Sequence, residues 1–272
     1  MTRFVRFPVT WMAVGIVVLI LIESLGYLGP GYTVLATAVA ACALGVWAYV
    51  LIMRHMARRA TPELAVRTLG RNLGIGLALG LGVMGLSFGA VWALGGYQVT
   101  VADLSGTERL RVLLIAFLAG LLPGIFEELM FRGFLLQSVE ALSGTWVGLA
   151  VSSLVFGAAH LANPHATWWS AVAISLEAGL LIGAVFLATR SLYAAVGLHF
   201  AWNFLVSLVG IPVSGGEAQG LLSTTAVGPM WLTGGDFGIE ASVVPVVCGT
   251  VVAVVALRVA ARRRAENPLE NP

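Results

Sequence analysis

Residues 33–53 read TVLATAVAACALGVWAYVLIM, a stretch of twenty-one residues without a charged side chain. A helix needs about 20 apolar residues to cross the hydrocarbon core of a bilayer, so this stretch predicts a membrane-spanning helix. The rest of the chain has the same character, with 59% hydrophobic residues, 10% charged residues and a mean hydropathy of +0.95. Soluble domains usually carry about a quarter charged residues, so a soluble fold is excluded.

The chain contains eight apolar runs of this kind, and helix-breaking residues fall between most of them. They cover residues 9–28, 33–53, 73–95, 110–126, 146–162, 168–189, 192–210 and 241–261. We expect an all-α fold, a polytopic membrane bundle of about eight transmembrane helices that forms a single domain over residues 1–272. The first run is too long for a typical signal peptide, so we expect a retained helix.

The charges indicate the orientation and the class of partner. All 15 basic residues are Arg, and they flank apolar runs, with five between positions 54 and 71 and three from Arg262 to Arg264. Positively charged short loops stay cytoplasmic, so both termini are predicted to be cytoplasmic, although Arg109 and Arg111 oppose the pattern. The chain has no basic stripe for nucleic acid. We expect the lipid bilayer as its surroundings, in a bacterial cytoplasmic membrane.

The first candidate segment is residues 123–133, PGIFEELMFRG, which contains two adjacent carboxylates and an Arg. Ionisable groups inside a bilayer are costly, so each is a functional candidate. We expect a helix to restart after a break at Pro123, with Glu128 and Arg132 four apart on one face as an ion pair. Glu127 is rotated by about 100° and would face the bundle interior. The alternative is a helix end with a surface ion pair.

Later runs add further polar groups. His160 ends the segment Phe156–His160 near the end of the fifth run, and His199 and Asn203 share one helix face in the seventh. Each also fits a structural role, such as one interhelical hydrogen bond. Glu177 lies in the middle of the sixth run, where it could gate access, titrate near His199 or pair with a neighbouring Arg.

Polar groups on several spans can converge only inside the bundle, and these types suit hydrolysis. A carboxylate can take a proton from water, His can orient the water or bind a metal, and Asn and His can donate to an oxyanion. Helical rise places His160 and His199 on levels that differ by about 10 Å. Helix tilt and the break at Pro123 are expected to close this gap. Glu23, in the first run, is expected at the membrane interface.

The three motifs resemble those of the CAAX prenyl endopeptidase and bacteriocin-processing family of intramembrane proteases, which includes many abortive-infection-like proteins. The family pattern has E-E-x-x-x-R, F-x-x-x-H and H-x-x-x-N or D in this order. Here the motifs read Glu127-Glu128 to Arg132, Phe156 to His160, and His199 to Asn203. The resemblance covers roughly residues 110–210, which we expect to be the catalytic core.

The resemblance implies cleavage of membrane-anchored peptides or proteins within or next to the membrane. It implies Glu127 as the base that activates water, His160 as its partner, and His199 with Asn203 as donors to the oxyanion. A metal-independent glutamate mechanism and a metalloprotease-like mechanism both stay open, since Glu127, His160 and His199 could also bind Zn.

Two other functions fit parts of the pattern. In a proton-coupled transporter, Glu127, Glu177, His160 and His199 would relay protons, but a relay does not require Asn203. A non-catalytic immunity or scaffold protein of the same fold would need none of the motif residues, yet all are retained.

Overall fold

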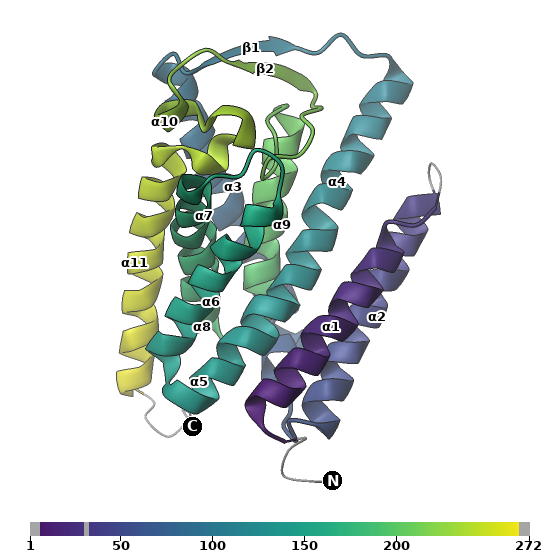
Figure 1. Ribbon diagram of the computed structural model, residues 1–272, viewed down its shortest axis with the longest axis vertical. Coiled ribbons are helices and arrows are strands. Elements are labelled where there is room, and N and C mark those ends of the chain that lie inside the picture. Colours follow the sequence, from purple (N-terminus) through teal and green to yellow (C-terminus); the bar gives the residue numbers. More distant parts are fainter. Residues whose placement is uncertain (1–5, 30–32, 267–272) are drawn as a thin grey trace.

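The computed structural model describes residues 6–29 and 33–266, and shows a bundle of long helices with a short two-stranded β-sheet across one end (Figure 1). Expectations for residues 1–5, 30–32 and 267–272 lie outside the described ranges. The helices are α1 (Pro8–Gly26), α2 (Thr33–His55), α3 (Leu69–Ala93), α4 (Gly106–Glu128), α5 (Gln137–Ser143), α6 (Thr145–Ala159), α7 (Trp168–Ile174), α8 (Leu181–Thr189), α9 (Leu192–Leu208), α10 (Met230–Thr233) and α11 (Val243–Glu266). Two π-helical segments, η3 (Leu129–Leu136) and η5 (Ser175–Leu180), join α4 to α5 and α7 to α8.

The all-α membrane bundle is confirmed. In the described ranges, seven helical stretches are long and apolar enough to cross a membrane, and each matches one of the predicted runs. The remaining predicted run forms α9, a shorter apolar helix of 17 residues. This helix packs against α3 and α4 inside the bundle, and most of its side chains are buried. The chain is therefore an integral membrane protein with one helix enclosed by the others.

The predicted helix break at Pro123 is wrong. The helical stretch runs without interruption from Gly106 to Ser143, through Pro123 and then through the π-helical segment η3. Proline has no N–H for the carbonyl four residues earlier, which is that of Ala119. The side chain of Asn203 on α9 supplies a donor to this carbonyl instead, at 3.2 Å. A partner on another helix thus compensates for the missing donor, and α4 continues.

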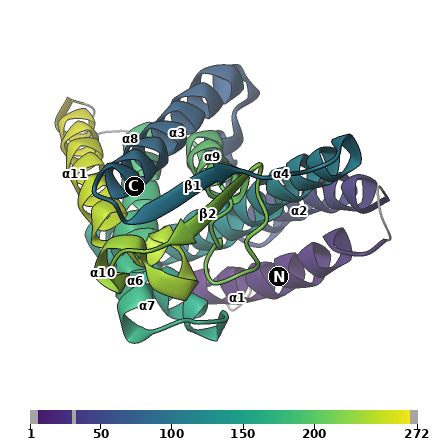
Figure 2. The ribbon, with the colours of Figure 1, turned by 90° about the horizontal axis from the view of Figure 1, so that it is seen from above.

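The strands β1 (Tyr97–Val101) and β2 (Leu222–Ala226) pair antiparallel, with Tyr97 opposite Ala226. Seen from above, they cross over one end of the bundle (Figure 2). The start of α1 and the end of α11 lie at the other end (Figure 1). The two described chain ends are thus on one side, and their cytoplasmic location stays a prediction.

Candidate active site

Helices α4 and α9 cross closely enough to bring two of the motifs together. A Cβ added at Gly120 would lie 2.8 Å from the carbonyl oxygen of Phe200, and one at Gly124 would lie 3.3 Å from the Phe200 nitrogen. Small residues permit this approach of two membrane helices. One turn further along α4, Glu127 and Glu128 lie beside His199 on α9.

Glu128 and Arg132 form the ion pair that their spacing predicted. Both side chains are fully buried, and Arg132 Nη1 donates to Glu128 Oε1 at 2.9 Å. The Arg132 Nη2 group donates to the carbonyl oxygens of Ala178 and Gly179 at 3.1 and 2.9 Å. The same Glu128 oxygen lies 2.7 Å from His199 Nδ1. An ionised carboxylate can only accept, so the imidazole donates here.

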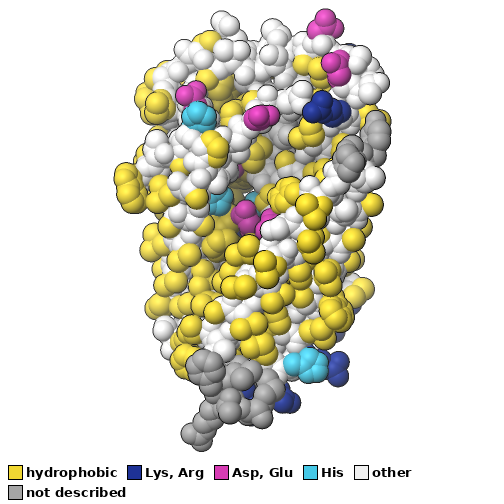
Figure 3. Space-filling model, turned by 45° about the vertical axis from the view of Figure 1, so that its right-hand side comes forward, with side chains coloured by type: hydrophobic (Ala, Val, Ile, Leu, Met, Phe, Trp, Pro, Cys, Tyr) yellow, Lys and Arg dark blue, Asp and Glu magenta, His cyan; other side chains and the backbone are white. Residues whose placement is uncertain are grey.

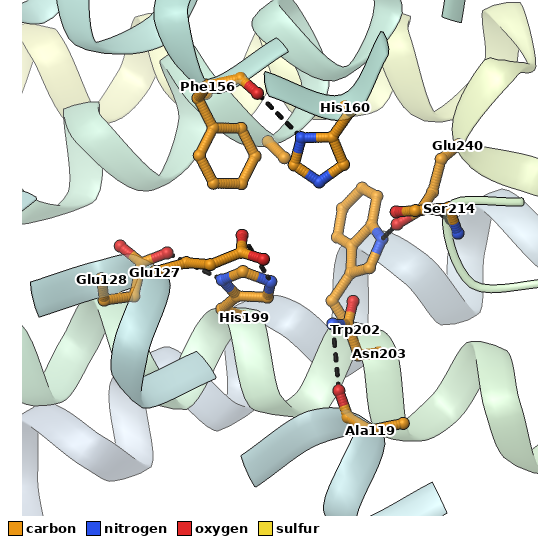
Figure 4. Close-up of polar contacts among 12 residues, drawn as sticks. Ala119, Glu127, Glu128, Phe156, His160, His199, Trp202, Asn203, Ser214 and Glu240 are labelled. Atoms are coloured by element: carbon orange, nitrogen blue, oxygen red, sulfur yellow. Dashed lines mark hydrogen bonds and ion pairs between the residues drawn. The ribbon is translucent and has the colours of Figure 1, made fainter. Parts of the chain in front are cut away.

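Glu127 has a different environment from its neighbour. Its side chain is 23% exposed, its Oε2 lies 4.0 Å from His199 Nε2, and this oxygen has no hydrogen-bond partner among the described residues. Glu127 lines a cavity of about 180 Å³ together with His160, His199 and Asn203. Figure 4 shows Glu127 and the two imidazoles around a shared space. Glu128 is thus held in place by a buried cation, whereas Glu127 faces the cavity.

The Phe156 ring packs against three of the predicted site residues, His160, His199 and Arg132. Its ring centroid lies 4.8 Å from that of His160 and 6.0 Å from that of His199, and the Arg132 guanidinium carbon lies 4.6 Å from it. His160 Nδ1 lies 2.7 Å from the Phe156 carbonyl oxygen, which can only accept. Nδ1 therefore carries the hydrogen, and in the neutral imidazole Nε2 is left as an acceptor at the cavity.

Asn203 connects the cavity to the proline in α4. One N–H of its amide is used by the Ala119 carbonyl oxygen, and the side chain also lines the cavity. A primary amide has two N–H groups, so the second is available to a ligand. Asn203 can therefore act on the helix and on a bound substrate at the same time.

Two further carboxylates line the same cavity. Glu177 is completely buried, and the suggested pairing with an Arg is absent, because neither of its oxygens has a hydrogen-bond partner among the described residues. Glu240 was not predicted. It accepts hydrogen bonds from Trp202 Nε1 at 3.2 Å and from the Ser214 nitrogen and Oγ at 2.5 and 2.9 Å. Burial raises the pKa of the Glu240 carboxyl above its usual range.

Sequence reasoning had no signal for Glu240, because it directly precedes the last apolar run, where an acid is ordinary. Glu23 on α1 is half-buried, and its location at the membrane interface stays a prediction. Of the seven predicted site residues, the structure places five around the cavity and the Glu128–Arg132 pair directly behind them. The five are Glu127, His160, Glu177, His199 and Asn203.

The predicted zinc ligands do not form a metal-binding group in the described ranges. There, no set of three or more His, Cys, Asp and Glu side chains is placed to hold a metal ion. His160 and His199 each use Nδ1 in a hydrogen bond, which leaves one nitrogen apiece. Zinc stays a prediction, and we assign it no step.

The fold and the site define an integral membrane protein with a polar, acidic and histidine-containing site enclosed by its helices. A family model described as type II CAAX prenyl endopeptidase, Rce1-like, matches residues 109–205. This segment carries all three motifs, and the resemblance predicted from them is confirmed there. The matched family is a family of proteases. Neither the curated proteins nor the solved structures contain a match to the chain.

Proposed function

We propose that the protein is an intramembrane endopeptidase that hydrolyses peptide bonds of membrane-associated peptides or proteins with water activated by Glu127. The observation that carries this proposal is the position of the Glu127 side chain, which is 23% exposed, makes no hydrogen bond through Oε2 and lines a cavity with two imidazoles. A base for water must be accessible and free of competing donors. Glu128, which is buried and bonded to Arg132 and His199, does not meet this requirement.

The charges of the site support distinct roles for its members. The carboxylates of Glu127 and Glu128 and the guanidinium of Arg132 together carry one net negative charge. A proton on His199 would neutralise this charge. A protonated His199 donates through Nδ1 to Glu128, and its Nε2–H is then available to an oxyanion. The second N–H of Asn203 is a further donor on the same helix face. These two residues are the proposed oxyanion donors.

The proposed reaction needs no covalent intermediate. Glu127 takes a proton from water while the oxygen attacks the carbonyl carbon of the substrate, and His160 Nε2 accepts a hydrogen bond from the same water. The carbonyl oxygen becomes an oxyanion at His199 and Asn203. When the C–N bond breaks, Glu127 returns its proton to the leaving nitrogen. The products are a carboxylic acid and an amine.

The surface of the molecule supports a substrate from the membrane. Figure 3 shows a hollow in a side of the bundle, with acidic and histidine side chains inside it and hydrophobic side chains around it. The hydrophobic surroundings suit a peptide that is anchored in lipid. The cavity also has to admit water, which hydrolysis consumes.

The test is peptide-bond cleavage by the full chain in liposomes with a panel of lipid-anchored peptides, followed by mass spectrometry. Glu127→Gln keeps the shape of the side chain and removes the base, so we expect a rate loss of roughly 10²–10⁴-fold with folding intact. Glu217→Gln removes an exposed acid outside the cavity and serves as the matched control.

Two results would contradict the proposal. Equal cleavage by wild type and Glu127→Gln would remove the base from the mechanism. Absence of cleavage by wild type over a broad panel would favour the scaffold or transporter functions. The same cleavage assay with a chelator added tests for a metal requirement. A loss of activity that added zinc restores would favour the metalloprotease-like mechanism.

A further inference from the structure

Glu177 is the least compensated acid in the described part of the chain. It is 0% exposed, and both of its carboxylate oxygens lack a hydrogen-bond partner. Other buried acids have donors: Glu63 is bonded to Tyr49 and Arg59, and Glu240 to Ser214 and Trp202. A buried carboxylate is unfavourable unless it is neutralised or paired, and a cation supplied from outside the chain would provide such a pairing for Glu177.

The surroundings of Glu177 increase this need. Glu177 lines the cavity together with Glu240, so two acidic side chains border the same space. His160, one of the proposed catalytic residues, lines the same cavity as these two acids. The cavity lining therefore includes two acids, Glu177 and Glu240, and no cationic side chain of the described residues is hydrogen-bonded to Glu177.

The backbone fixes this arrangement. Glu177 lies in the π-helical segment η5, and such segments are frequent at functional sites. Helix α11 packs directly behind it, since a Cβ added at Gly249 would lie 2.8 Å from the Glu177 carbonyl oxygen. The Glu177 backbone is thus enclosed by α11, and the residue lines the cavity on another side.

We propose that Glu177 and Glu240 form an acidic subsite that binds the cationic side chain of a substrate Lys or Arg near the scissile bond. This proposal rests on the proposed peptidase function, since the subsite shares its cavity with Glu127 and His160. The cavity volume of about 180 Å³ is well above the ~10–15 Å³ that one water requires. Space and charge both suit the end of one long cationic side chain.

An organic cation fits this subsite better than a metal ion. The described residues place no group of three or more metal-ligating acids, histidines and cysteines together. A guanidinium, in contrast, can donate to two carboxylates through its several N–H groups. Membrane-anchored proteins commonly carry Lys and Arg next to their membrane spans. Substrates that combine a lipid-embedded segment with a neighbouring cation are therefore a natural class for this site.

The first arm of the test measures binding without catalysis. Thermal unfolding of the full chain in detergent is followed with butylguanidinium and with butylurea, a neutral molecule of nearly the same shape. A ligand that binds only the folded state raises the unfolding temperature. We expect butylguanidinium to raise it by several degrees more than butylurea in wild type and in the Glu217→Gln control. The difference should vanish in Glu177→Gln and shrink in Glu240→Gln.

Two results of this arm would overturn the proposal. One is an equal effect of butylguanidinium in wild type and Glu177→Gln. The other is an increase with a divalent metal ion and none with butylguanidinium, which would assign the acids to a metal.

The second arm measures specificity with lipid-anchored peptides that differ only in Lys, Arg or norleucine at one position beside the scissile bond. We expect wild type to prefer the cationic peptides by about 10-fold in kcat/KM, and Glu177→Gln to bring this ratio close to one. Cleavage of all peptides at equal rates would overturn the subsite and leave the peptidase standing. Binding of butylguanidinium through Glu177 without any cleavage would instead reject the peptidase and keep a cation site.

Discussion

His199 Nδ1 donates a hydrogen bond to Glu128 Oε1 over 2.7 Å, and the Glu128 carboxylate is itself bonded to the buried Arg132. The bond joins the first motif to the third and determines which imidazole nitrogen faces the cavity. Adjacent glutamates therefore have separate tasks: Glu128 orients a histidine, and Glu127 is available to water.

Glu128→Gln tests this division of tasks. The amide keeps the shape but removes the charge that holds His199 in one protonation state, so we expect kcat to fall by roughly 100-fold or more with little change in KM. Steady-state kinetics on a cleaved peptide measure both constants. A raised KM with unchanged kcat would show that Glu128 serves substrate binding instead.

Replacement of Arg132 tests the stability of the buried cluster. Arg132→Met removes the buried guanidinium that pairs with the fully buried Glu128, and we expect a loss of about 3–5 kcal/mol in the free energy of unfolding. Arg190→Met is the matched control, because its ion pair with Glu140 is partly exposed and should contribute about 0–1 kcal/mol. Denaturant unfolding in detergent compares the two. Similar losses for both variants would contradict the role of burial.

Close packing of α6 on the following helix positions Phe156 and His160. A Cβ added at Gly157 would collide with the Ala171 carbonyl oxygen and the Ser175 side chain, so Gly157→Ala should displace α6 and reduce both stability and cleavage. A Cβ added at Gly82 in α3 would have no neighbouring atom within 4 Å. Gly82→Ala should therefore raise the free energy of unfolding by about 0.5–1 kcal/mol. Unfolding temperatures and cleavage rates of the two variants check the contrast. Unchanged cleavage activity in Gly157→Ala would contradict the role of this packing in positioning Phe156 and His160.

Much of this arrangement could be predicted from the sequence because it depends on local spacing. The length of apolar runs predicted the helices, and the four-residue separation of Glu128 and Arg132 predicted their ion pair. The continuity of α4 through Pro123 could not be predicted, since the compensating hydrogen bond comes from Asn203, far along the chain. Glu240 was missed for the same reason: its donors and its cavity are assembled only by tertiary contacts.

The pH dependence of cation binding provides a check on the acidic subsite. Burial raises the pKa of Glu240 above the ordinary value of 4.5, and a carboxylate attracts a cation only above its pKa. The stabilising effect of butylguanidinium should therefore weaken as the pH falls, beginning at a higher pH than for an exposed glutamate. The titratable groups that act on Glu240 are Glu177 and His160, which line the same cavity.

Asn203 allows a structural role and a catalytic role to be separated by a double-mutant cycle. Asn203→Ala leaves the Ala119 carbonyl without a donor, which should cost about 1–3 kcal/mol. Pro123→Ala returns a backbone N–H to that carbonyl, so the same Asn203→Ala change should cost about 1 kcal/mol less in this background. Cleavage should not recover in the double variant, because the proposed oxyanion donor is still missing. Unfolding free energies and cleavage rates of the four proteins measure both effects, and recovery of cleavage in the double variant would make Asn203 a purely structural residue.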